Sequence, residues 1–449
     1  MMRRLLVAFI AAMVSALPAR AQPATKWVTT WAASVQGPYP SGNPSAQPDL
    51  RFAFPTPASG AHDQTLRMIV RPDVWGRQVR LRFSNAFGTQ PVTIADVYAG
   101  VQSSGAELLR GSNRRVLFGG LARVTIPSGG EAWSDAAAVS AADPSALAGR
   151  KLAVSFHIVG DSGPMTWHAK ALTTSYVTAP GAGARAAAED ESAFSFATTS
   201  WFFLDAVDMR LPADTRLIVA FGDSITDGTA STLNGDDRWP DVLSRRLRRA
   251  FGERVAVVNA GIGGNRVVGP ATYSATNPIA GGPSAGQRLE RDVLSLSGVT
   301  AVIWLEGIND FGRGVDAPVE VVSAAMREIV GRIRDRIRGA TVVGATLVSA
   351  LHSTNGAHGS VEEDQKRHAL NAFIRTSGVF DAVADFDAAT IDAATGELRP
   401  QFVPDNTTGG PGDRLHPNRA GYAAMANAID LTKLGLGPAT LGTAVSRKP

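Results

Sequence analysis

Residues 217–228 read LIVAFGDSITDG, and this stretch decides how the second half of the chain folds. Residues 217–221 are apolar and partly β-branched, which is typical of a strand buried on both faces. Gly222 ends the run, so Asp223 and Ser224 stand where the strand gives way to the next element. A serine in this place can lie at the carboxyl edge of a parallel sheet, where open α/β folds bind ligands. It can equally be the N-cap of a helix.

The same kind of apolar run recurs along the rest of the chain, each time followed by a helical pattern. The expected strands are residues 217–221, 254–259, 299–305, 341–348 and 381–386. The expected helices lie near residues 239–251, 287–296, 317–337, 361–376 and 418–430. Alternation of strands and helices predicts a doubly wound parallel sheet that is covered on both faces. We assign this α/β domain to residues 212–449.

Residues 24–211 show a different period. In QVRLRFSN, Val79, Leu81 and Phe83 alternate with Arg80 and Arg82, which is typical of a half-buried antiparallel strand. Similar short runs follow one another, separated by Gly, Pro, Ser and Asn. Repeated short strands with turns between them predict an all-β domain, either a sandwich or a jelly roll. The boundary between the two domains is expected near Leu211 and Pro212.

The first 21 residues have the layout of a secretory signal peptide. Arg3 and Arg4 precede an apolar run over residues 5–17, and small residues surround Arg20 at a possible cleavage point. The run is too short to span a membrane. We therefore expect a signal peptide at residues 1–21 and an exported protein, either secreted or periplasmic.

The charge and cysteine content narrow the possible partners. The 449 residues include 44 Lys and Arg against 40 Asp and Glu, a net charge of +4. The predicted signal holds three of the arginines and no acid, so its removal leaves +1. Nucleic-acid binding would need a concentrated basic face, which this balance does not favour. With no cysteine in the chain, disulfides and thiol chemistry are excluded.

Polar residues gather where the expected parallel strands end. Asp223 and Ser224 follow the first strand, NAGIGGN at residues 259–265 ends the second, and GIND at residues 307–310 follows the third. Near the C-terminus, DRLHP places Asp413 three residues before His416. The carboxyl ends of parallel strands share one edge of a sheet, so these segments can converge.

These four blocks, GDSITDG, NAGIGGN, GIND and DRLHP, resemble those of the SGNH or GDSL hydrolases in both order and position. The resemblance covers roughly residues 214–432. It implies a three-layer α/β/α esterase or acylhydrolase that needs no metal or cofactor. By the same resemblance Ser224 is the nucleophile, His416 the general base and Asp413 the carboxylate that orients it. The backbone N–H groups of Ser224 and Gly264, with the Asn309 side chain, would form the oxyanion hole.

The residue types suit these roles. A serine hydroxyl becomes a good nucleophile when a base accepts its proton, and histidine titrates close enough to neutrality to do so. A carboxylate beside the imidazole fixes its tautomer, and Asn309 offers a neutral donor to a developing oxyanion. Taken singly, His416 or Asn309 could be a helix cap, Asp413 a turn former and Gly264 a loop glycine. Their placement at matching strand ends favours the catalytic interpretation.

The substrate is less clear from the sequence. The segment from Gly264 to Arg288 is rich in Gly, Ser, Asn and Pro, which favours short acyl groups, such as acetyl esters on a small molecule or a carbohydrate. This long segment is a candidate pocket wall, and residues 352–360 are a second one. The alternatives are a lipase-like acylhydrolase of longer esters and a non-catalytic glycan-binding protein. In the last case some of the six tryptophans between residues 27 and 201 would stack on sugar rings, although most of them are expected in the core.

Overall fold

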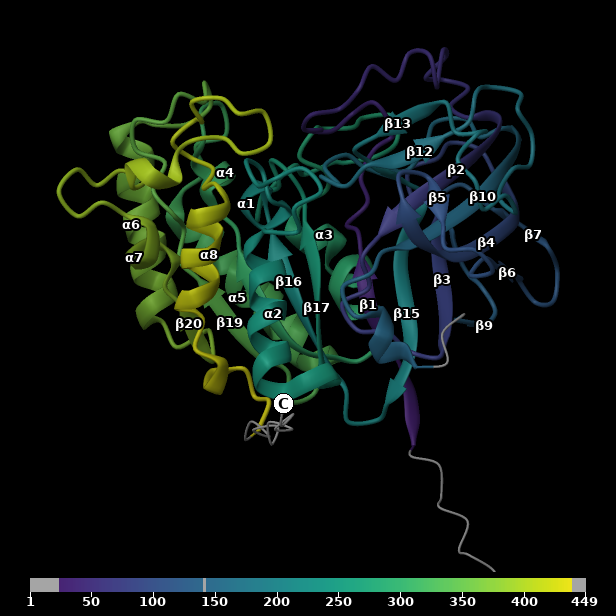
Figure 1. Cartoon of the computed structure of the whole chain (residues 1–449). Helices are drawn as coiled ribbons and strands as arrows, with labels where there is room; N and C mark the ends of the chain where they lie inside the picture. Colours follow the sequence, from purple (N-terminus) through teal and green to yellow (C-terminus); the bar gives the residue numbers. More distant parts are fainter. Residues whose placement is uncertain (1–23, 140–142, 438–449) are drawn as a thin grey trace, which may run out of the picture.

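The structure is a computed structural model that describes residues 24–139 and 143–437 (Figure 1). The signal peptide expected at residues 1–21 lies outside the described residues. Figure 1 shows a β-rich half, built from the N-terminal residues, beside a half in which helices surround a sheet. Within the part of the chain that is described, no helix combines the length and hydrophobicity needed to cross a membrane.

The N-terminal half contains two antiparallel sheets and a short two-stranded one. The first sheet has the order β1-β15-β3-β8, with β9 paired to β3: β1 (Thr25–Ala32), β15 (Leu204–Pro212), β3 (Gln78–Ser84), β8 (Glu131–Trp133) and β9 (Ala137–Ala138). The second has the order β13-β12-β2-β10-β4-β5: β13 (Phe196–Thr198), β12 (Ser175–Val177), β2 (His62–Val70), β10 (Leu152–Asp161), β4 (Val92–Ser104) and β5 (Glu107–Leu108). β6 (Arg114–Val116) and β7 (Arg123–Ile126) also pair with β4, and β11 (Trp167–His168) pairs with β14 (Trp201–Phe202).

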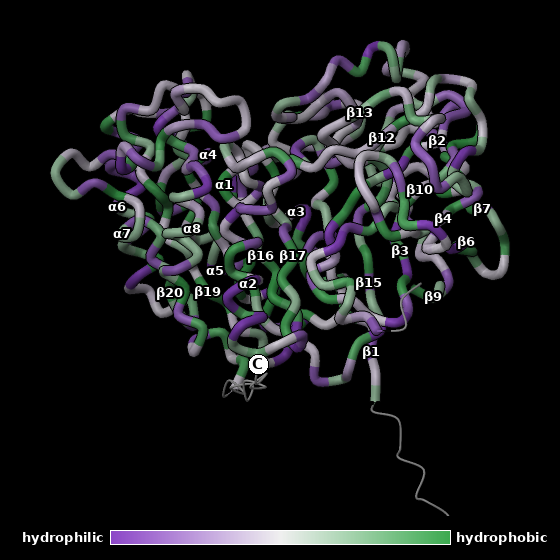
Figure 2. Tube along the Cα trace, viewed as in Figure 1, coloured by the Kyte–Doolittle hydropathy of each residue, from purple (hydrophilic) through white to green (hydrophobic). Residues whose placement is uncertain are grey.

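The C-terminal half is built on one parallel sheet. Its order is β17-β16-β18-β19-β20: β17 (Val255–Gly261), β16 (Arg216–Gly222), β18 (Val299–Leu305), β19 (Thr341–Ala345) and β20 (Ala382–Ala384). Figure 2 shows apolar residues gathered along the central strands, as burial on both faces requires.

The last two strands are shorter than the sequence pattern predicts. β19 ends at Ala345 instead of residue 348, and β20 ends at Ala384 because Asp385 begins a helix, α7 (Phe386–Thr390). The Asp385 carboxylate caps α7 by accepting the N–H of Ala388, and it also accepts the Thr346 hydroxyl just beyond β19. Capping by a local carboxylate thus outweighs the apolar pattern at this edge of the sheet.

The helices form two groups of neighbours. One group contains α2 (Trp239–Phe251), α7 and α8 (Arg419–Ala428), and the other contains α3 (Ala285–Leu289), α5 (Val319–Arg336) and α6 (Val361–Thr376). In Figure 1, α2 and α8 lie in front of the sheet and α5 lies behind it. The expected helix near residues 287–296 is found as α3 followed by a π-helical turn over Glu290–Leu294.

The two halves share one interior. A single buried apolar cluster includes Val28 and Leu81 of the N-terminal half and Val257 and Trp304 of the C-terminal half. β1 also lies against β17, and Thr29 exchanges two hydrogen bonds of 2.9 Å with the backbone of Ser297. The β-rich half is therefore packed onto the α/β half as part of a continuous core.

The packing of the two halves changes the exposure of the arginines in β3. Val79, Leu81 and Phe83 are buried as predicted, but Arg82 is buried as well, and Arg80 keeps only 27% of its side chain exposed. Arg82 is only 2% exposed and donates to Asp205 at 2.8 Å, to the Ser295 hydroxyl and to the Arg291 carbonyl. The prediction of a half-buried strand is wrong at this position because its polar face is covered by the other half of the protein.

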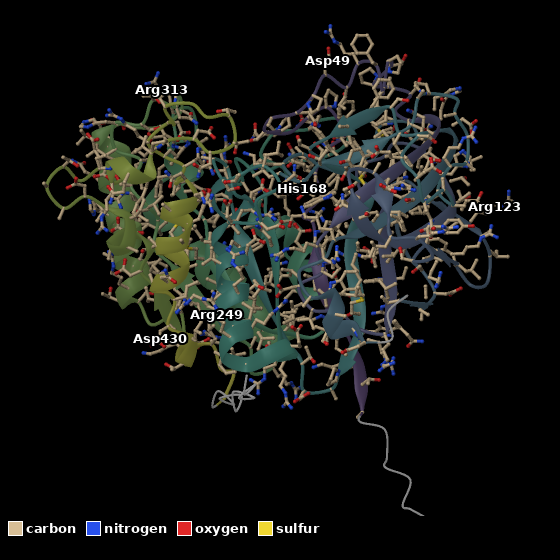
Figure 3. All side chains as sticks on the ribbon, in the orientation of Figure 1. Asp49, Arg123, His168, Arg249, Arg313 and Asp430 are labelled. Atoms are coloured by element: carbon tan, nitrogen blue, oxygen red, sulfur yellow. The ribbon has the colours of Figure 1, made fainter. Side chains whose placement is uncertain are left out.

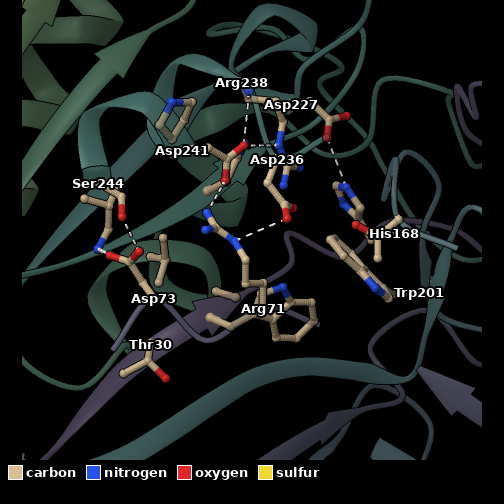
Figure 4. Close-up of a pocket in the computed structure, with 17 residues that line it drawn as sticks. Thr30, Arg71, Asp73, His168, Trp201, Asp227, Asp236, Arg238, Asp241 and Ser244 are labelled. Atoms are coloured by element: carbon tan, nitrogen blue, oxygen red, sulfur yellow. Dashed lines mark hydrogen bonds and ion pairs between the residues drawn. The ribbon is translucent and has the colours of Figure 1, made fainter. Parts of the chain in front are cut away.

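Buried ion pairs continue along the junction between the halves. They surround a cavity of about 40 Å³, shown in Figure 4. Arg71 pairs with Asp241 at 3.1 Å and with Asp236 at 3.5 Å, while Arg238 pairs with Asp241 at 2.9 Å. Asp73 accepts the Ser244 hydroxyl and the N–H of Val257 in β17. Satisfied polar contacts of this kind fix one relative position of the two halves.

Arg82→Ala should lower the free energy of unfolding by about 3–5 kcal/mol, because it leaves the Asp205 carboxylate buried without its partner. Burial already raises the pKa of Asp205 to about 6, even with Arg82 beside it. Urea denaturation measures the effect. The control is Arg334→Ala, which breaks an exposed pair with Asp381 and should cost less than about 1 kcal/mol. Equal losses in the two variants would contradict this account of the junction.

Candidate active site

Ser224 lies directly beyond the carboxyl end of β16, an inner strand of the parallel sheet. Asp223 caps the short helix α1 (Ser224–Asp227) by accepting the N–H of Ile225 at 2.9 Å, and Ser224 is the first residue of that helix. Gly222 can have no side chain, since a Cβ there would lie 2.2 Å from the Leu305 carbonyl oxygen. The tight strand-to-helix turn therefore presents Ser224 at the edge of the sheet.

The structure brings Ser224, His416 and Asp413 into one hydrogen-bonded chain. Ser224 Oγ lies 2.8 Å from His416 Nε2, and His416 Nδ1 lies 2.6 Å from Asp413 Oδ2. The other oxygen of Asp413 accepts the N–H groups of Leu415 and His416. Burial would raise the pKa of Asp413, but the hydrogen bonds and charge of His416 hold it well below its usual range. The carboxylate is thus ionised and aimed at the imidazole.

α8 holds His416 in place from behind. Asn418 caps this helix by accepting the N–H groups of Ala420 and Gly421, so the helix begins two residues after Pro417. Tyr422 is fully buried, and its hydroxyl donates to the Thr229 carbonyl just beyond α1. The histidine and serine loops are therefore tied together.

The proposed oxyanion donors also lie at this edge. Gly264 has φ +83°, a conformation that favours glycine, and it follows the end of β17. Among the described residues, neither the Ser224 N–H nor the Gly264 N–H has a hydrogen-bond acceptor. Asn309, in α4 (Ile308–Phe311), donates one amide hydrogen to the Asn265 carbonyl at 2.9 Å. Its second amide hydrogen remains available to a ligand.

Two residues that the sequence analysis did not single out organise these loops. Asp227 accepts the Gly263 N–H at 2.9 Å, although it stands inside the GDSITDG motif and could have been noticed there. Arg288 is completely buried and donates to the carbonyls of Gly222 and Ala260 at 2.7 and 2.8 Å. It also donates to the Asn265 side chain at 2.6 Å. Its only signal in the sequence is its place at the end of the long glycine-rich segment.

A group of buried carboxyls lies beneath the serine turn. Burial raises the pKa of Asp223 to about 8, that of Glu306 to about 7 and that of Asp310 to about 6. Asp310 accepts the N–H groups of Val267 and Val268, which fixes the start of the long segment. One oxygen of Asp223 has no hydrogen-bond partner within the described residues. Burial thus favours the uncharged form of Asp223, the residue next to Ser224.

A cavity of about 240 Å³ opens beside His416. Its lining includes Thr229, Asp405, Thr408, Gly412 and Asp413. The long segment 264–288, the first candidate wall, lies instead against the N-terminal half, where Tyr273 bonds to the backbone of Gly37. Segment 352–360 lies nearer the histidine loop, because Ser353 and Thr354 both donate to the Asp413 carbonyl. In residues 24–139 and 143–437, no group of three or more His, Asp or Glu side chains could hold a metal ion.

Asp223→Asn should make stability less dependent on pH. A carboxyl with a raised pKa keeps its proton to higher pH in the folded protein, so its stabilising effect is present below the unfolded pKa near 4. That effect is lost as the pH rises through about 8, the folded pKa of Asp223. Between pH 5 and pH 9 the wild type should lose at least about 2 kcal/mol more than the variant, measured by urea denaturation. Parallel pH profiles would contradict the raised pKa.

Comparison with known proteins finds a family match in the C-terminal part of the chain. The model of the GDSL-like Lipase/Acylhydrolase family matches residues 220–424. No curated protein matches the sequence. Several solved structures are similar to the structure of this chain, with TM-scores below 0.4. They include Est24, a carbohydrate acetylesterase from Sinorhizobium meliloti, at 15% identity over 48% of this chain and 96% of that chain, with a TM-score of 0.36.

Two further structures match at similar levels. A putative arylesterase from Agrobacterium tumefaciens is 18% identical over 48% of this chain and 96% of its own, with a TM-score of 0.35. The aryl esterase of M. smegmatis is 17% identical over 49% of this chain and 100% of its own, with a TM-score of 0.36. The family match spans the serine, glycine, asparagine and histidine blocks described above. Residues 220–424 therefore form a domain of the GDSL-like lipase/acylhydrolase family, and the protein is a carboxylic ester hydrolase.

Proposed function

We propose that this protein is an exported serine esterase that removes short acyl groups, such as acetyl, from carbohydrate or small-molecule esters. It would act through Ser224, His416 and Asp413, on a three-layer α/β/α domain that follows a β-sandwich. The observation that carries the proposal is the hydrogen-bonded chain from Ser224 Oγ through His416 to Asp413. This geometry is what general-base activation of a serine requires.

Acylation begins when Ser224 Oγ attacks the ester carbonyl carbon while His416 Nε2 accepts the serine proton. Asp413 holds the Nδ1 proton and stabilises the imidazolium that forms. The carbonyl oxygen becomes an oxyanion, which accepts hydrogen bonds from the Ser224 N–H, the Gly264 N–H and the Asn309 amide. The C–O bond to the leaving alcohol then breaks, and His416 donates its proton to that oxygen. An acyl-serine ester remains.

Deacylation reverses these roles with water as the nucleophile. His416 accepts a proton from water, and the water oxygen attacks the acyl carbon. The same three donors stabilise the second oxyanion. When the bond to Ser224 Oγ breaks, His416 returns the proton to the serine, and the free carboxylic acid leaves. The cycle consumes one ester and one water and needs no cofactor.

The preference for a short acyl group rests on the surroundings of His416. The cavity of about 240 Å³ on the Asp413 side of His416 has a lining that is mostly polar or glycine, including Asp405, Thr408 and Gly412. A long acyl chain would need an apolar groove to replace its contact with water. Carboxylate and hydroxyl side chains instead suit the hydroxyls of a sugar or another polar alcohol.

The tryptophans of the N-terminal half do not favour the alternative of a glycan-binding protein. Trp31, Trp75, Trp167 and Trp201 are buried in the core. Trp27 and Trp133 are partly exposed, but the guanidinium of Arg80 lies over both rings, at 4.8 and 4.4 Å. One face of each of these two rings is therefore occupied by an arginine instead of being open to a sugar.

Export remains part of the proposal, supported by the sequence of residues 1–21. Expression of the full chain in a bacterial host should give a protein whose N-terminus begins near Gln22, recovered from the periplasm or medium. N-terminal sequencing measures this. Recovery of the uncleaved chain from the cytoplasm alone would contradict export without affecting the catalytic assignment.

Ser224→Ala should reduce hydrolysis of p-nitrophenyl acetate by at least about 10⁴-fold, because the nucleophile is removed. In the wild type, kcat/KM should fall from acetate to decanoate esters. The assay is release of p-nitrophenol by the mature protein across this series.

The matched control is Ser162→Ala. Ser162 stands in a second Gly-Asp-Ser sequence, but its hydroxyl accepts the Ala61 N–H inside the β-rich half. This control should keep wild-type activity. Full activity in Ser224→Ala would overturn the catalytic assignment, whereas a preference for decanoate would favour the lipase-like alternative.

A further inference from the structure

The peptide group between Gly263 and Gly264 carries both a proposed oxyanion donor and a carbonyl that is held from the β-rich half. Its N–H, on Gly264, is one of the proposed oxyanion donors, and its C=O belongs to Gly263. Because a trans peptide is planar, the C=O and the N–H point in opposite directions. Any group that fixes the Gly263 carbonyl therefore also fixes the direction of the Gly264 N–H.

Asn43, from the β-rich half, is that group. It lies in the segment between β1 and β2, and its Nδ2 donates to the Gly263 carbonyl at 2.7 Å. A Cβ on Gly264 would lie 2.8 Å from the same Nδ2, and a Cβ on Gly263 would lie 3.3 Å from Asn43 Cβ. Asn43 is thus packed against both glycines, on the side opposite the N–H that would face the substrate.

The other polar group of Gly263 is fixed as well. Its N–H donates to Asp227, whose second oxygen lies 3.1 Å from His168 Nε2 (Figure 4). His168 Nδ1 lies 2.8 Å from the Ser34 carbonyl, which can only accept, so both ring nitrogens carry protons. Figure 3 shows His168 between the two halves of the molecule. The β-rich half therefore reaches Gly263 by two routes.

Lys170 adds a third contact from the β-rich half. It is buried, its ammonium donates to the Thr229 hydroxyl, and it lies 3.1 Å from the position of a Cβ on Gly263. Thr229 in turn donates its N–H to the Ser224 carbonyl at 3.0 Å. The loop of the nucleophile and the loop of the oxyanion glycine are therefore both braced from the same side.

We propose that Asn43 is a positioning residue for the oxyanion hole, and that the β-rich half is for this reason a working part of the esterase site. This inference rests on the proposed function. In it, Asn43 touches no reacting atom and acts through the orientation of the Gly264 N–H. Preorganised donors stabilise a transition state more than a bound substrate, so the effect should appear in kcat and leave KM nearly unchanged.

The experiment compares Asn43→Ala and Asn43→Asp with Asn309→Ala in the mature full-length protein, using p-nitrophenyl acetate. Asn43→Ala should lower kcat about 10–100-fold, less than the 10²–10³-fold expected on removal of a donor itself. Asn43→Asp keeps the size of the side chain but turns an acceptor toward the Gly263 carbonyl, so its loss should be at least as large. KM should change less than about threefold in each Asn43 variant.

Asn43→Ser serves as the conservative variant. Its hydroxyl can still donate, although from a shorter side chain, so it should recover part of the kcat lost in Asn43→Ala. In the double variant Asn43→Ala with Asn309→Ala, the two losses should not multiply, because both act on the same oxyanion.

Gln47→Ala is the matched control. It tests whether any substitution that loosens the segment between β1 and β2 lowers kcat. Gln47 is an amide in the same stretch of chain, but it bonds to Thr198 and Ser200 within the β-rich half. Its removal should leave kcat within about twofold of wild type if the effect of Asn43 is specific. Thermal melting of every variant shows whether the fold is kept.

Several outcomes would overturn the inference. Wild-type kcat in both Asn43→Ala and Asn43→Asp would show that the oxyanion peptide needs no external support. A raised KM at unchanged kcat would assign Asn43 to substrate binding, and an equal loss in Gln47→Ala would assign the effect to general loosening. In each case an inactive Ser224→Ala variant leaves the proposed function intact, whereas an active one overturns that function separately.

Discussion

The buried guanidinium of Arg288 is the contact on which the arrangement of the site depends. Three elements meet there: the end of β16, the end of β17 and the Asn265 side chain, each through a hydrogen bond of 2.8 Å or less. A buried cation is costly unless its donors are satisfied, and Arg288 also pairs with Asp292 at 3.1 Å and lies over the Phe221 ring. The strand ends must keep their relative positions to satisfy it. The turn that carries Ser224 and the loop that carries Gly264 are thereby held at a fixed separation.

The two halves of the molecule depend on each other for a related reason. The junction is rich in charged groups whose partners lie in the other half: Arg71 pairs with Asp241, and Arg82 donates to the Ser295 hydroxyl and the Arg291 carbonyl. An apolar junction could slide or repack with little change in energy, whereas directional hydrogen bonds tolerate little displacement. Side chains of the β-rich half that contact the loops of Ser224 and Gly264 are therefore held at fixed positions, although they belong to different sheets.

The parallel sheet could be predicted from the sequence because its strands are short, apolar and separated by helices of clear period. The positions of Ser224, Asp413 and His416 could also be proposed in advance, since each falls in a compact motif after a strand or before a helix. The structure brings these three within hydrogen-bonding distance. The contribution of Asn43 could not be found in this way, because it bonds to Gly263, 220 residues later in the chain. The cover over Arg82 was missed for the same reason: alternation along a strand says which residues share a face but not what packs on that face.

The ion pair between His168 and Asp227 has a consequence for how related sequences can differ. Each residue is buried, and each satisfies the charge of the other across the junction between the two halves. Loss of either residue leaves the charge of the other buried without a partner, which costs folding stability. A change at position 168 should therefore be accompanied by a change at position 227. Homologues that carry a β-rich half of this kind should therefore vary the two positions together, and those that lack it should have lost both charges or covered the aspartate with another donor. The residues found at these two positions, which are 59 apart in the sequence, should therefore differ between homologues with the β-rich half and homologues without it.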